Sequence, residues 1–423
     1  MRRTVALDLT CLFLAPLSRT PRGIDRVELA YAEHFLRNST TECVGVLPTP
    51  WGVRFYERDR AIRGIDIVKS LWRERVDAST DDILVAARAA LCAPPGGAAI
   101  VGATRAPSIF EKIEGFWQII GGAGFSFGRS CRKRLPTNSI YLNVGQLTVF
   151  RSFFRWLSAR SDVSAVFMVH DAIPIEYPDH HAAAGVRLHH SIFQNVAEFA
   201  TALIMPSETA KESVLRHLRA YDRRDRPAHA ELLPVPDAFL ETAEPDQTLR
   251  NQPYFVVCGA IDAHKNHLTL LRAWEIILER NGNNAPKLVI AGSSGVTSAP
   301  VFEFLRTSVS IQKHVLIASG LSTAGLRQLV RASSGVLMPS IAEGFGLPIV
   351  EALAQAVPVI ASDIPAHREA GSGGSVQYVE SMDAEKWVAA IEQFWLNPNP
   401  NIVYSPKTWT DYFGNIERFL SSI

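Results

Sequence analysis

Six short apolar runs in the second half of the chain constrain its fold most strongly. They lie near residues 254–258, 287–291, 315–318, 335–338, 357–361 and 376–379, and segments of helical periodicity separate most of them. Strands that alternate with helices at this spacing are typical of βαβ units, whose parallel strands form one sheet with helices on its faces. The sequence therefore predicts an α/β fold with a doubly wound parallel sheet.

The first half of the chain has a similar but less regular pattern. Strands are predicted near residues 4–9, 42–48, 140–144, 165–169 and 202–205. Residues 235–253 are rich in Pro, Asp and Glu and have little periodicity, which indicates a linker. A chain of 423 residues is long enough for two domains.

A glycine-containing loop follows the predicted strand at 335–338 and leads into a helix that opens at Pro348. Proline suits a first helical position because its missing N–H would have no partner there. Free N–H groups at a helix N-terminus stabilise an anion such as phosphate. In this loop those N–H groups belong to Gly344, Phe345, Gly346 and Leu347.

Two carboxylates flank this predicted anion site. Glu343 lies on the loop, and Glu351 follows eight positions later in the helix. A carboxylate beside a phosphate is repelled by it, so each is better suited to accept hydrogen bonds from hydroxyl groups. A ligand that carries both a phosphate and several hydroxyls is a nucleotide-sugar.

The segment EGFGLPIVE, followed by VPVIASD and by Glu369 and Gly371, resembles the retaining glycosyltransferases of family 4, which have the GT-B fold. The resemblance extends to YFVVCGAIDAHKNHLTLLRAW (254–274) and VHDAIPIEYP (169–178). It implies two Rossmann-like domains that face each other across a cleft. Residues 1–240 would bind the acceptor, residues 241–405 would bind the donor, and a helix in 406–423 would return to the first domain.

The resemblance also implies roles for individual residues on the donor side. Glu351 would bind the ribose hydroxyls, Glu343 the hydroxyls of the transferred sugar, and Lys265 the diphosphate, where an ammonium stabilises the leaving group. Considered alone, Glu351 can also be explained as a carboxylate that complements a helix dipole, and Lys265, with less weight, as a surface lysine next to a helix start. The full donor set is Gly23, Gly259, Lys265, Glu343, Gly344, Phe345, Gly346, Leu347 and Glu351.

The chain departs from the family pattern at two positions near Lys265. Resembling enzymes commonly carry arginine where this chain has His264, and some carry another where it has Ala260. Part of the usual positive charge at the diphosphate is therefore missing, and Arg368 or Arg22 is expected to compensate.

Candidate acceptor-side residues lie in two segments of the first half. Arg22, Asp25 and Arg26 belong to a loop that, by resemblance, faces both the donor phosphates and the acceptor. Resembling enzymes often have Gly-Ile-Gly-Arg there, whereas this chain has Gly23-Ile24-Asp25-Arg26. A tight turn with solvated arginines explains the same residues. His170 and Asp171 follow a predicted strand, at the edge of the sheet where ligands gather. By resemblance, His170 lies near the sugar and joins Lys265 and Glu343 as a catalytic residue, while Asp171 orients it or begins the next loop.

Composition excludes several classes of protein. Lys and Arg number 43 against 42 Asp and Glu, which argues against a general nucleic-acid binder. No metal-ligand motif accompanies the twelve histidines, so neither a metal nor a cofactor is expected. Five scattered cysteines favour a cytoplasmic location, and no apolar run is long enough to span a membrane. Aromatic and basic residues within 108–135 fit either peripheral contact with the inner face of the cytoplasmic membrane or a helix packed on its own domain.

The sequence thus predicts a retaining, metal-independent hexosyltransferase. Its donor would be GDP-mannose or a UDP-sugar, and its acceptor a glycan or lipid-diphosphate-linked oligosaccharide of O-antigen, capsule or exopolysaccharide synthesis. Two alternatives stay open: a non-catalytic nucleotide-sugar-binding scaffold, and a GT-B enzyme that hydrolyses or epimerises a nucleotide-sugar without an acceptor.

Overall fold

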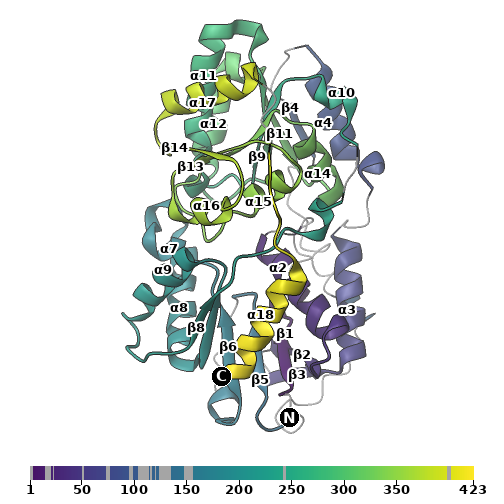
Figure 1. The fold of residues 1–423 in the computed structure, drawn as a ribbon, viewed down its shortest axis with the longest axis vertical. Helices are drawn as coiled ribbons and strands as arrows, with labels where there is room; N and C mark the ends of the chain where they lie inside the picture. Colours follow the sequence, from purple (N-terminus) through teal and green to yellow (C-terminus); the bar gives the residue numbers. More distant parts are fainter. Residues whose placement is uncertain are drawn as a thin grey trace.

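Two seven-stranded sheets, one in each lobe of the molecule, organise the computed structural model (Figure 1). The structure describes residues 3–14, 21, 23–49, 52–72, 77–94, 99–102, 114, 117–119, 121–122, 135–146, 156–241, 244–397 and 402–423. Most of the segment 108–135, together with Arg22, lies outside the described residues.

The first sheet has the order β3-β2-β1-β5-β6-β7-β8, and its neighbouring strands are parallel except for the antiparallel pair β2–β3. Its strands are β1 Val5–Asp8, β2 Cys43–Thr49, β3 Gly52–Tyr56, β5 Ile140–Asn143, β6 Ser164–Met168, β7 Ala202–Met205 and β8 Ala228–Ala230. The helices of this lobe are α1 Thr10–Leu14, α2 Gly23–Glu33, α3 Arg58–Leu71, α7 Ile173–Glu176, α8 Ala183–Phe199 and α9 Glu208–Leu218.

The second sheet has the order β14-β13-β12-β9-β10-β11-β4, and all its strands are parallel. Its strands are β4 Ala99–Gly102, β9 Tyr254–Cys258, β10 Lys287–Ala291, β11 Val315–Ser319, β12 Gly335–Met338, β13 Val359–Ser362 and β14 Val376–Val379. Its helices are α4 Asp82–Cys92, α10 Gln247–Arg250, α11 His267–Asn281, α12 Ala299–Thr307, α13 Val309–Gln312, α14 Thr323–Arg331, α15 Leu347–Ala354, α16 Pro365–Ala370 and α17 Ala384–Leu396.

Both faces of each sheet are buried, which explains the continuous apolar runs in the sequence. In β6, Val166 and Met168 belong to one hydrophobic cluster, while Ala165 and Phe167 belong to the cluster on the opposite face. Successive side chains of a strand point to opposite faces, so a strand covered by helices on both sides must be apolar throughout. The predicted α/β architecture with doubly wound parallel sheets is confirmed.

Helix α4 and strand β4 belong with the second sheet, although the sequence placed both segments in the first domain. Strand β4 is hydrogen-bonded to β11, with Ala99 opposite Leu316. The buried Asp81 carboxylate accepts hydrogen bonds from the N–H groups of Ile83 and Ser322, and so fixes the start of α4 to the turn before α14. The sequence pattern could not reveal that β4 joins the second sheet, because β4 and its partner β11 are far apart in the chain.

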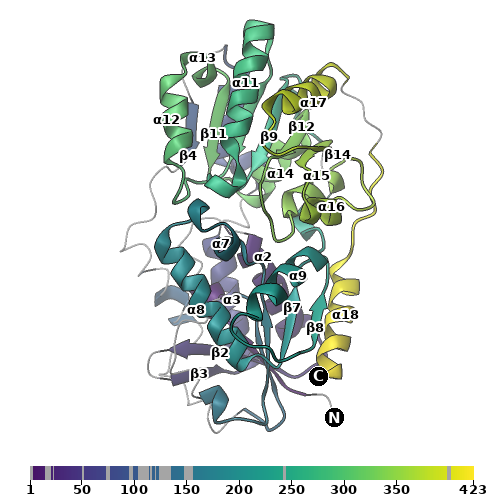
Figure 2. The same cartoon turned by 90° about the vertical axis from the view of Figure 1, so that its left-hand side faces the viewer.

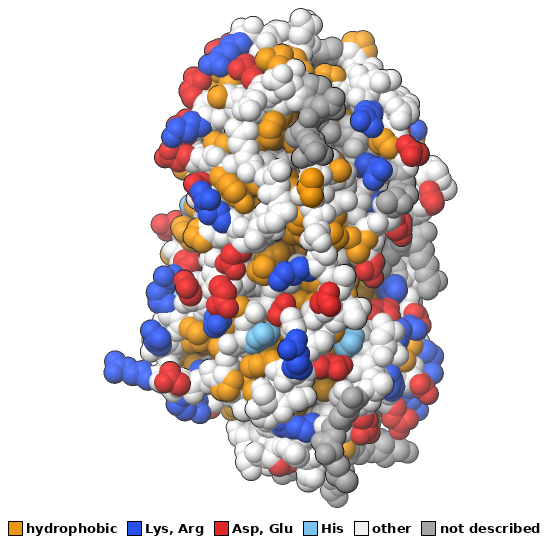
Figure 3. All heavy atoms as spheres, in the orientation of Figure 1, with side chains coloured by type: hydrophobic (Ala, Val, Ile, Leu, Met, Phe, Trp, Pro, Cys, Tyr) orange, Lys and Arg blue, Asp and Glu red, His pale blue; other side chains and the backbone are white. Residues whose placement is uncertain are grey.

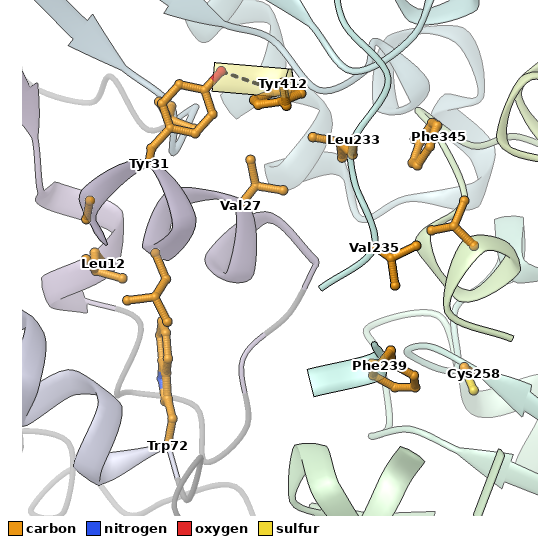
Figure 4. Close-up of a cluster of buried hydrophobic side chains, with 14 of the residues drawn as sticks. Leu12, Val27, Tyr31, Trp72, Leu233, Val235, Phe239, Cys258, Phe345 and Tyr412 are labelled. Carbon is orange, nitrogen blue, oxygen red and sulfur yellow. Dashed lines mark hydrogen bonds between the residues drawn. The ribbon is translucent and has the colours of Figure 1, made fainter. Parts of the chain in front are cut away.

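A second connection between the lobes runs through the segment that precedes β9 and through the last helix. Leu233, Val235 and Phe239 lie between the lobes in the same buried cluster as Val27 of α2 and Phe345 of the second lobe (Figure 4). Helix α18 Trp409–Ser422 lies along the first lobe (Figures 1 and 2). Its Tyr412 hydroxyl is 2.8 Å from that of Tyr31. The lobes therefore share one continuous hydrophobic core.

Candidate active site

The N-terminus of α15 faces the first lobe. Gly346 precedes the helix with a φ of +109°, a conformation that strains other residues, and no side chain caps the first turn. A Cβ built on Gly23, at the start of α2, would lie 3.4 Å from Leu347 Cδ1. The glycine turn of one lobe thus lies against the open helix N-terminus of the other, where an anion would be stabilised.

Phe345 contributes to this site through its backbone. Its side chain is buried in the shared hydrophobic cluster and points toward the connecting segment around Val235 (Figure 4). This anchorage fixes the loop that carries Gly344 and Gly346.

Lys265 and Glu343 form an ion pair at the edge of the second sheet. The Lys265 Nζ lies 2.5 Å from Glu343 Oε1, and the Ser340 hydroxyl donates to the same oxygen over 2.7 Å. Lys265 ends a 3₁₀ turn, Ala263–Lys265, that follows β9 and Gly259. Gly259 has a φ of +133°, so the chain can turn sharply at the end of the strand.

The surroundings of Glu343 keep it ionised. Burial alone would raise the pKa of this carboxyl, but the charge of Lys265 and the neighbouring His367 lower it to about 2. Lys265 is thereby held in place by a permanent negative charge. The pair is part of the second lobe alone.

Glu351 is paired with a cation from the other lobe. Arg26 of α2 donates from Nη1 to Glu351 Oε1 over 2.8 Å. Burial raises the pKa of the Glu351 carboxyl, and the Arg26 charge offsets that effect only in part. The sequence named Arg26 as an acceptor-side residue, on a loop expected to face the donor phosphates as well, and its contact here is with a predicted donor residue.

Each of these carboxylates keeps one oxygen available. Both contacts of Glu343 and the contact of Glu351 are made with Oε1. Among the described residues, no donor reaches either Oε2, and neither Oε2 is a buried atom without a partner. Both oxygens are therefore placed to accept hydrogen bonds from a ligand.

The first lobe brings His170 next to the loop that precedes α15. Its backbone carbonyl lies so near Gly344 that a Cβ on this glycine would come within 2.4 Å of it. The ring donates from Nε2 to the Val144 carbonyl over 2.8 Å, which leaves Nδ1 as the acceptor. Burial lowers the pKa of His170, so the ring is neutral at pH 7. Ser207 adds a further contact, donating to the Gly344 carbonyl over 2.6 Å.

The two acidic residues on the acceptor side have different surroundings. Asp171 Oδ1 accepts a hydrogen bond from the N–H of Ile173 at the start of α7. Asp25 is fully buried in the first turn of α2, and its charge acts on His170.

The positions where resembling enzymes carry arginine have distinct surroundings. Ala260 is exposed, and the His264 ring stacks on His181 of the first lobe with centroids 5.1 Å apart. Burial and the Lys265 charge lower the pKa of His264 to about 4. Arg368, expected to compensate, pairs instead with Asp363 and lies over the ring of Tyr378.

Ser207, His181 and Ser340 were not predicted from the sequence as parts of this site. Ser207 is the N-cap of α9, where its hydroxyl accepts a hydrogen bond from the Ala210 N–H. His181 follows the VHDAIPIEYP segment closely, and Ser340 lies in the loop that holds Glu343. Their closeness in sequence to these two segments was the only sign that they could belong to the site.

A cavity of about 680 Å³ lies apart from these residues, in the second lobe, where Asp363, Tyr378, Glu380 and Lys386 line it. Basic and acidic side chains are interspersed on the face in Figure 3. In the part of the chain that the structure describes, no group of three His, Cys, Asp or Glu side chains is arranged to hold a metal ion. Within the same residues, no helix is both long and apolar enough to cross a membrane.

Two lobes, each built on a doubly wound parallel sheet and meeting where Gly23, His170 and Ser207 of one contact the loop before α15 of the other, define the GT-B fold. Sucrose-phosphate synthase from Thermosynechococcus elongatus has this arrangement. It superposes with a TM-score of 0.56 over 100% of this chain and 94% of its own, at 14% sequence identity. A likeness at this identity establishes the fold.

Sequence comparison identifies the second lobe more closely. Residues 241–407 match the family described as "Glycosyl transferases group 1". The serotype-specific mannosyltransferase WbdA of Escherichia coli is 28% identical over 251 residues, covering 54% of this chain and 30% of WbdA. The O-antigen chain mannosyltransferase RfbU of Salmonella typhimurium is 27% identical over 146 residues, covering 34% of this chain and 39% of RfbU. The chain thus matches less than half the length of either relative.

Proposed function

We propose that this chain is a glycosyltransferase that moves a sugar from a nucleoside diphosphate sugar to a hydroxyl group of a glycan or lipid-linked acceptor. The observation that carries the proposal is the Lys265–Glu343 ion pair beside the uncapped N-terminus of α15, with Glu351 in the same helix. A cation and helix amides suit a diphosphate, and the free carboxylate oxygens suit hydroxyls.

The site residues divide the reaction between them. Lys265 and the α15 amides stabilise the negative charge that builds on the departing diphosphate, in place of a metal ion. Glu343 orients the transferred sugar, Glu351 binds the ribose, and the neutral His170 accepts a hydrogen bond at Nδ1 from a sugar hydroxyl. The bond between the anomeric carbon and the phosphate oxygen breaks, the acceptor oxygen bonds to the same face of that carbon, and the acceptor proton passes to the leaving phosphate. Such a front-face substitution retains the anomeric configuration.

The similarity to WbdA and RfbU supports a mannosyl donor and a role in O-antigen or related surface polysaccharide synthesis. GDP-mannose is therefore the first donor to test, with UDP-sugars next. A lipid-diphosphate-linked acceptor would place the protein at the inner face of the cytoplasmic membrane.

The test is donor turnover by the purified protein. GDP-mannose and individual UDP-sugars are supplied with and without a bacterial lipid extract, and the released nucleoside diphosphate is measured. The proposal expects release from one donor, stimulation by the extract, and loss in Lys265→Ala. Lys313→Ala, which changes an exposed lysine outside the site, serves as the control and should keep activity.

Three other results would contradict the proposal. Release at a rate that the extract does not change, with free sugar or an epimer as product, would indicate a hydrolase or epimerase. Nucleotide binding without turnover of any donor would indicate a scaffold. An inverted anomeric configuration in the product, measured by NMR, would overturn the front-face mechanism while leaving the transferase intact.

A further inference from the structure

The Arg26–Glu351 contact is poorly explained as a structural ion pair. The Arg26 side chain is 19% exposed and that of Glu351 only 4%, so both groups have lost most of their water. Removing two charged groups from water costs free energy unless their remaining donors and acceptors also form hydrogen bonds. Here they do not, because Arg26 Nε is buried without a partner among the described residues.

The hydrogen bonding of Arg26 is also incomplete. A guanidinium has five N–H donors in a planar fork suited to two-point contact with a carboxylate or phosphate. In this structure a single hydrogen bond, from Nη1 to Oε1, joins it to the described residues. Unused donors on the cation and an unused oxygen on its partner are what a ligand-binding group shows before its ligand arrives.

The two ion pairs of the cleft share this arrangement. Lys265 occupies one oxygen of Glu343, and Arg26 occupies one oxygen of Glu351. On the proposed function, the donor brings a diphosphate that attracts cations and hydroxyls that suit carboxylates. Binding would let each cation and each carboxylate exchange its partner for a part of the donor.

Arg26 is also well placed to reach the diphosphate. It lies one helical turn after Gly23, whose backbone lies against Leu347 at the N-terminus of α15. Residues three apart share one side of a helix. The second lobe lacks arginine at positions 260 and 264, and its Arg368 is engaged with Asp363.

We propose that Arg26 is a donor-positioning residue contributed by the first lobe: it pairs with Glu351 in the free protein and transfers to the diphosphate when a nucleoside diphosphate binds. Glu351 then accepts hydrogen bonds from the ribose. This inference rests on the proposed function. It makes recognition of the diphosphate depend on the two lobes lying together, because Lys265 and Arg26 come from different lobes.

The experiment separates the parts of the ligand. Guanosine, GMP and GDP, and the matching uridine series, are titrated calorimetrically into wild type, Arg26→Gln and Arg26→Lys. Arg26→Gln should weaken diphosphate binding by about 10- to 100-fold, the usual effect of losing a hydrogen bond to a charged group. Nucleoside binding should be unchanged or tighter, because Glu351 loses its competitor. Arg26→Lys should recover part of the diphosphate affinity.

Controls distinguish failure of this inference from failure of the proposed function. Arg272→Gln, which alters an exposed arginine of α11, should bind like wild type. If wild type binds neither diphosphate, or Lys265→Ala binds equally well, the proposed function fails. If binding depends on Lys265 but Arg26→Gln leaves diphosphate affinity intact, only the Arg26 assignment is wrong. A parallel loss of nucleoside and diphosphate affinity in Arg26→Gln would likewise overturn it, since Arg26 would then act on Glu351 alone.

Discussion

Glu343 and Glu351 lie eight residues apart beside one helix N-terminus, yet their electrostatic surroundings are opposite. Glu343 has its cation, Lys265, in its own lobe, and its pKa is lowered to about 2. Glu351 has its cation, Arg26, in the other lobe, and burial raises its pKa despite that partner. One carboxylate is thus charged by its local structure, whereas the charge of the other depends on how the lobes meet.

This difference suggests a division of labour in the proposed reaction. A carboxylate whose cation lies in its own lobe suits the sugar, whose orientation must not vary during the reaction. A carboxylate whose counter-ion arrives from the opposite lobe couples binding of the nucleoside to closure of the cleft.

The largest effect is expected on turnover in Glu343→Gln. The amide keeps the shape of the side chain but removes the charge that orients both Lys265 and the sugar, so kcat should fall by about 100- to 1000-fold. In Glu351→Gln the main effect should be a roughly tenfold rise in donor KM, as for one weakened hydrogen bond. Steady-state kinetics with Glu303→Gln, an exposed carboxylate of α12, as the control would measure both. Equal losses of kcat in Glu343→Gln and Glu351→Gln would show that the two carboxylates do not have the different roles proposed here.

The next largest difference between Glu343 and Glu351 is expected in how each affects the free energy of unfolding as the pH changes. Folding lowers the pKa of Glu343 from 4.5 to about 2, so its contribution is fully present above pH 4.5 and is lost as the pH falls toward 2. Glu343→Gln should therefore lower the free energy of unfolding at pH 7 by on the order of 3 kcal/mol, with a smaller further loss in acid than wild type.

Glu351 should show the opposite sign. Because its pKa is raised on folding, its ionisation costs stability as the pH rises above 4.5. Glu351→Gln should remove that cost and leave stability at pH 7 equal to or above that of wild type. Urea denaturation followed by circular dichroism would measure both variants, and destabilisation of Glu351→Gln matching that of Glu343→Gln would contradict the comparison.

Gly344→Ala should disturb the contact between the lobes. The added Cβ would lie 2.4 Å from the His170 carbonyl, so the lobes must separate slightly. We expect about a tenfold loss of donor affinity, because separation of the lobes weakens the Arg26 contact with Glu351, whereas Lys265 and Glu343 belong to one lobe. Gly185→Ala, where a Cβ meets nothing within 4 Å, is the matched control. Unchanged calorimetric affinity in Gly344→Ala would show that lobe contact does not govern binding.

The second lobe could be predicted from sequence more fully than the first. Strands β9 to β14 lie where the apolar runs indicated, because strands buried on both faces alternate with helices of similar length. Strand β4 could not be placed in the second sheet, since a four-residue apolar run carries no information about a partner more than two hundred residues later. The fold class was predictable, but the place of β4 in the second sheet was not.

The candidate site divides in the same way. Glu343, Glu351 and the loop between them were readable from one segment, and Lys265 from another in the same lobe. The partner of Arg26 was not, because the contact joins residues 325 positions apart. One signal was available: Arg26 lies in the first turn of a helix, where the dipole disfavours a cation unless an anion lies nearby.

The smallest effect is expected for a contact between the lobes at α9. The Glu369 carboxylate of α16 accepts hydrogen bonds from the N–H groups of Glu208 and Thr209, over 2.8 and 2.7 Å, and so caps a helix of the first lobe from the second. Loss of a capping side chain costs about 1 kcal/mol. Glu369→Ala should therefore destabilise the closed cleft slightly.

That small change bears directly on the comparison of the two carboxylates. Looser lobes would separate Arg26 from Glu351 but leave Lys265 and Glu343 together, because the latter two belong to one lobe. Glu369→Ala should therefore raise donor KM a few-fold, roughly as 1 kcal/mol implies, with kcat unchanged. Glu212→Ala, an exposed carboxylate of α9 itself, should change neither. A fall in kcat without a change in KM would mean that the Lys265–Glu343 pair also depends on contact between the lobes. The proposed difference between Glu343 and Glu351 would then be wrong.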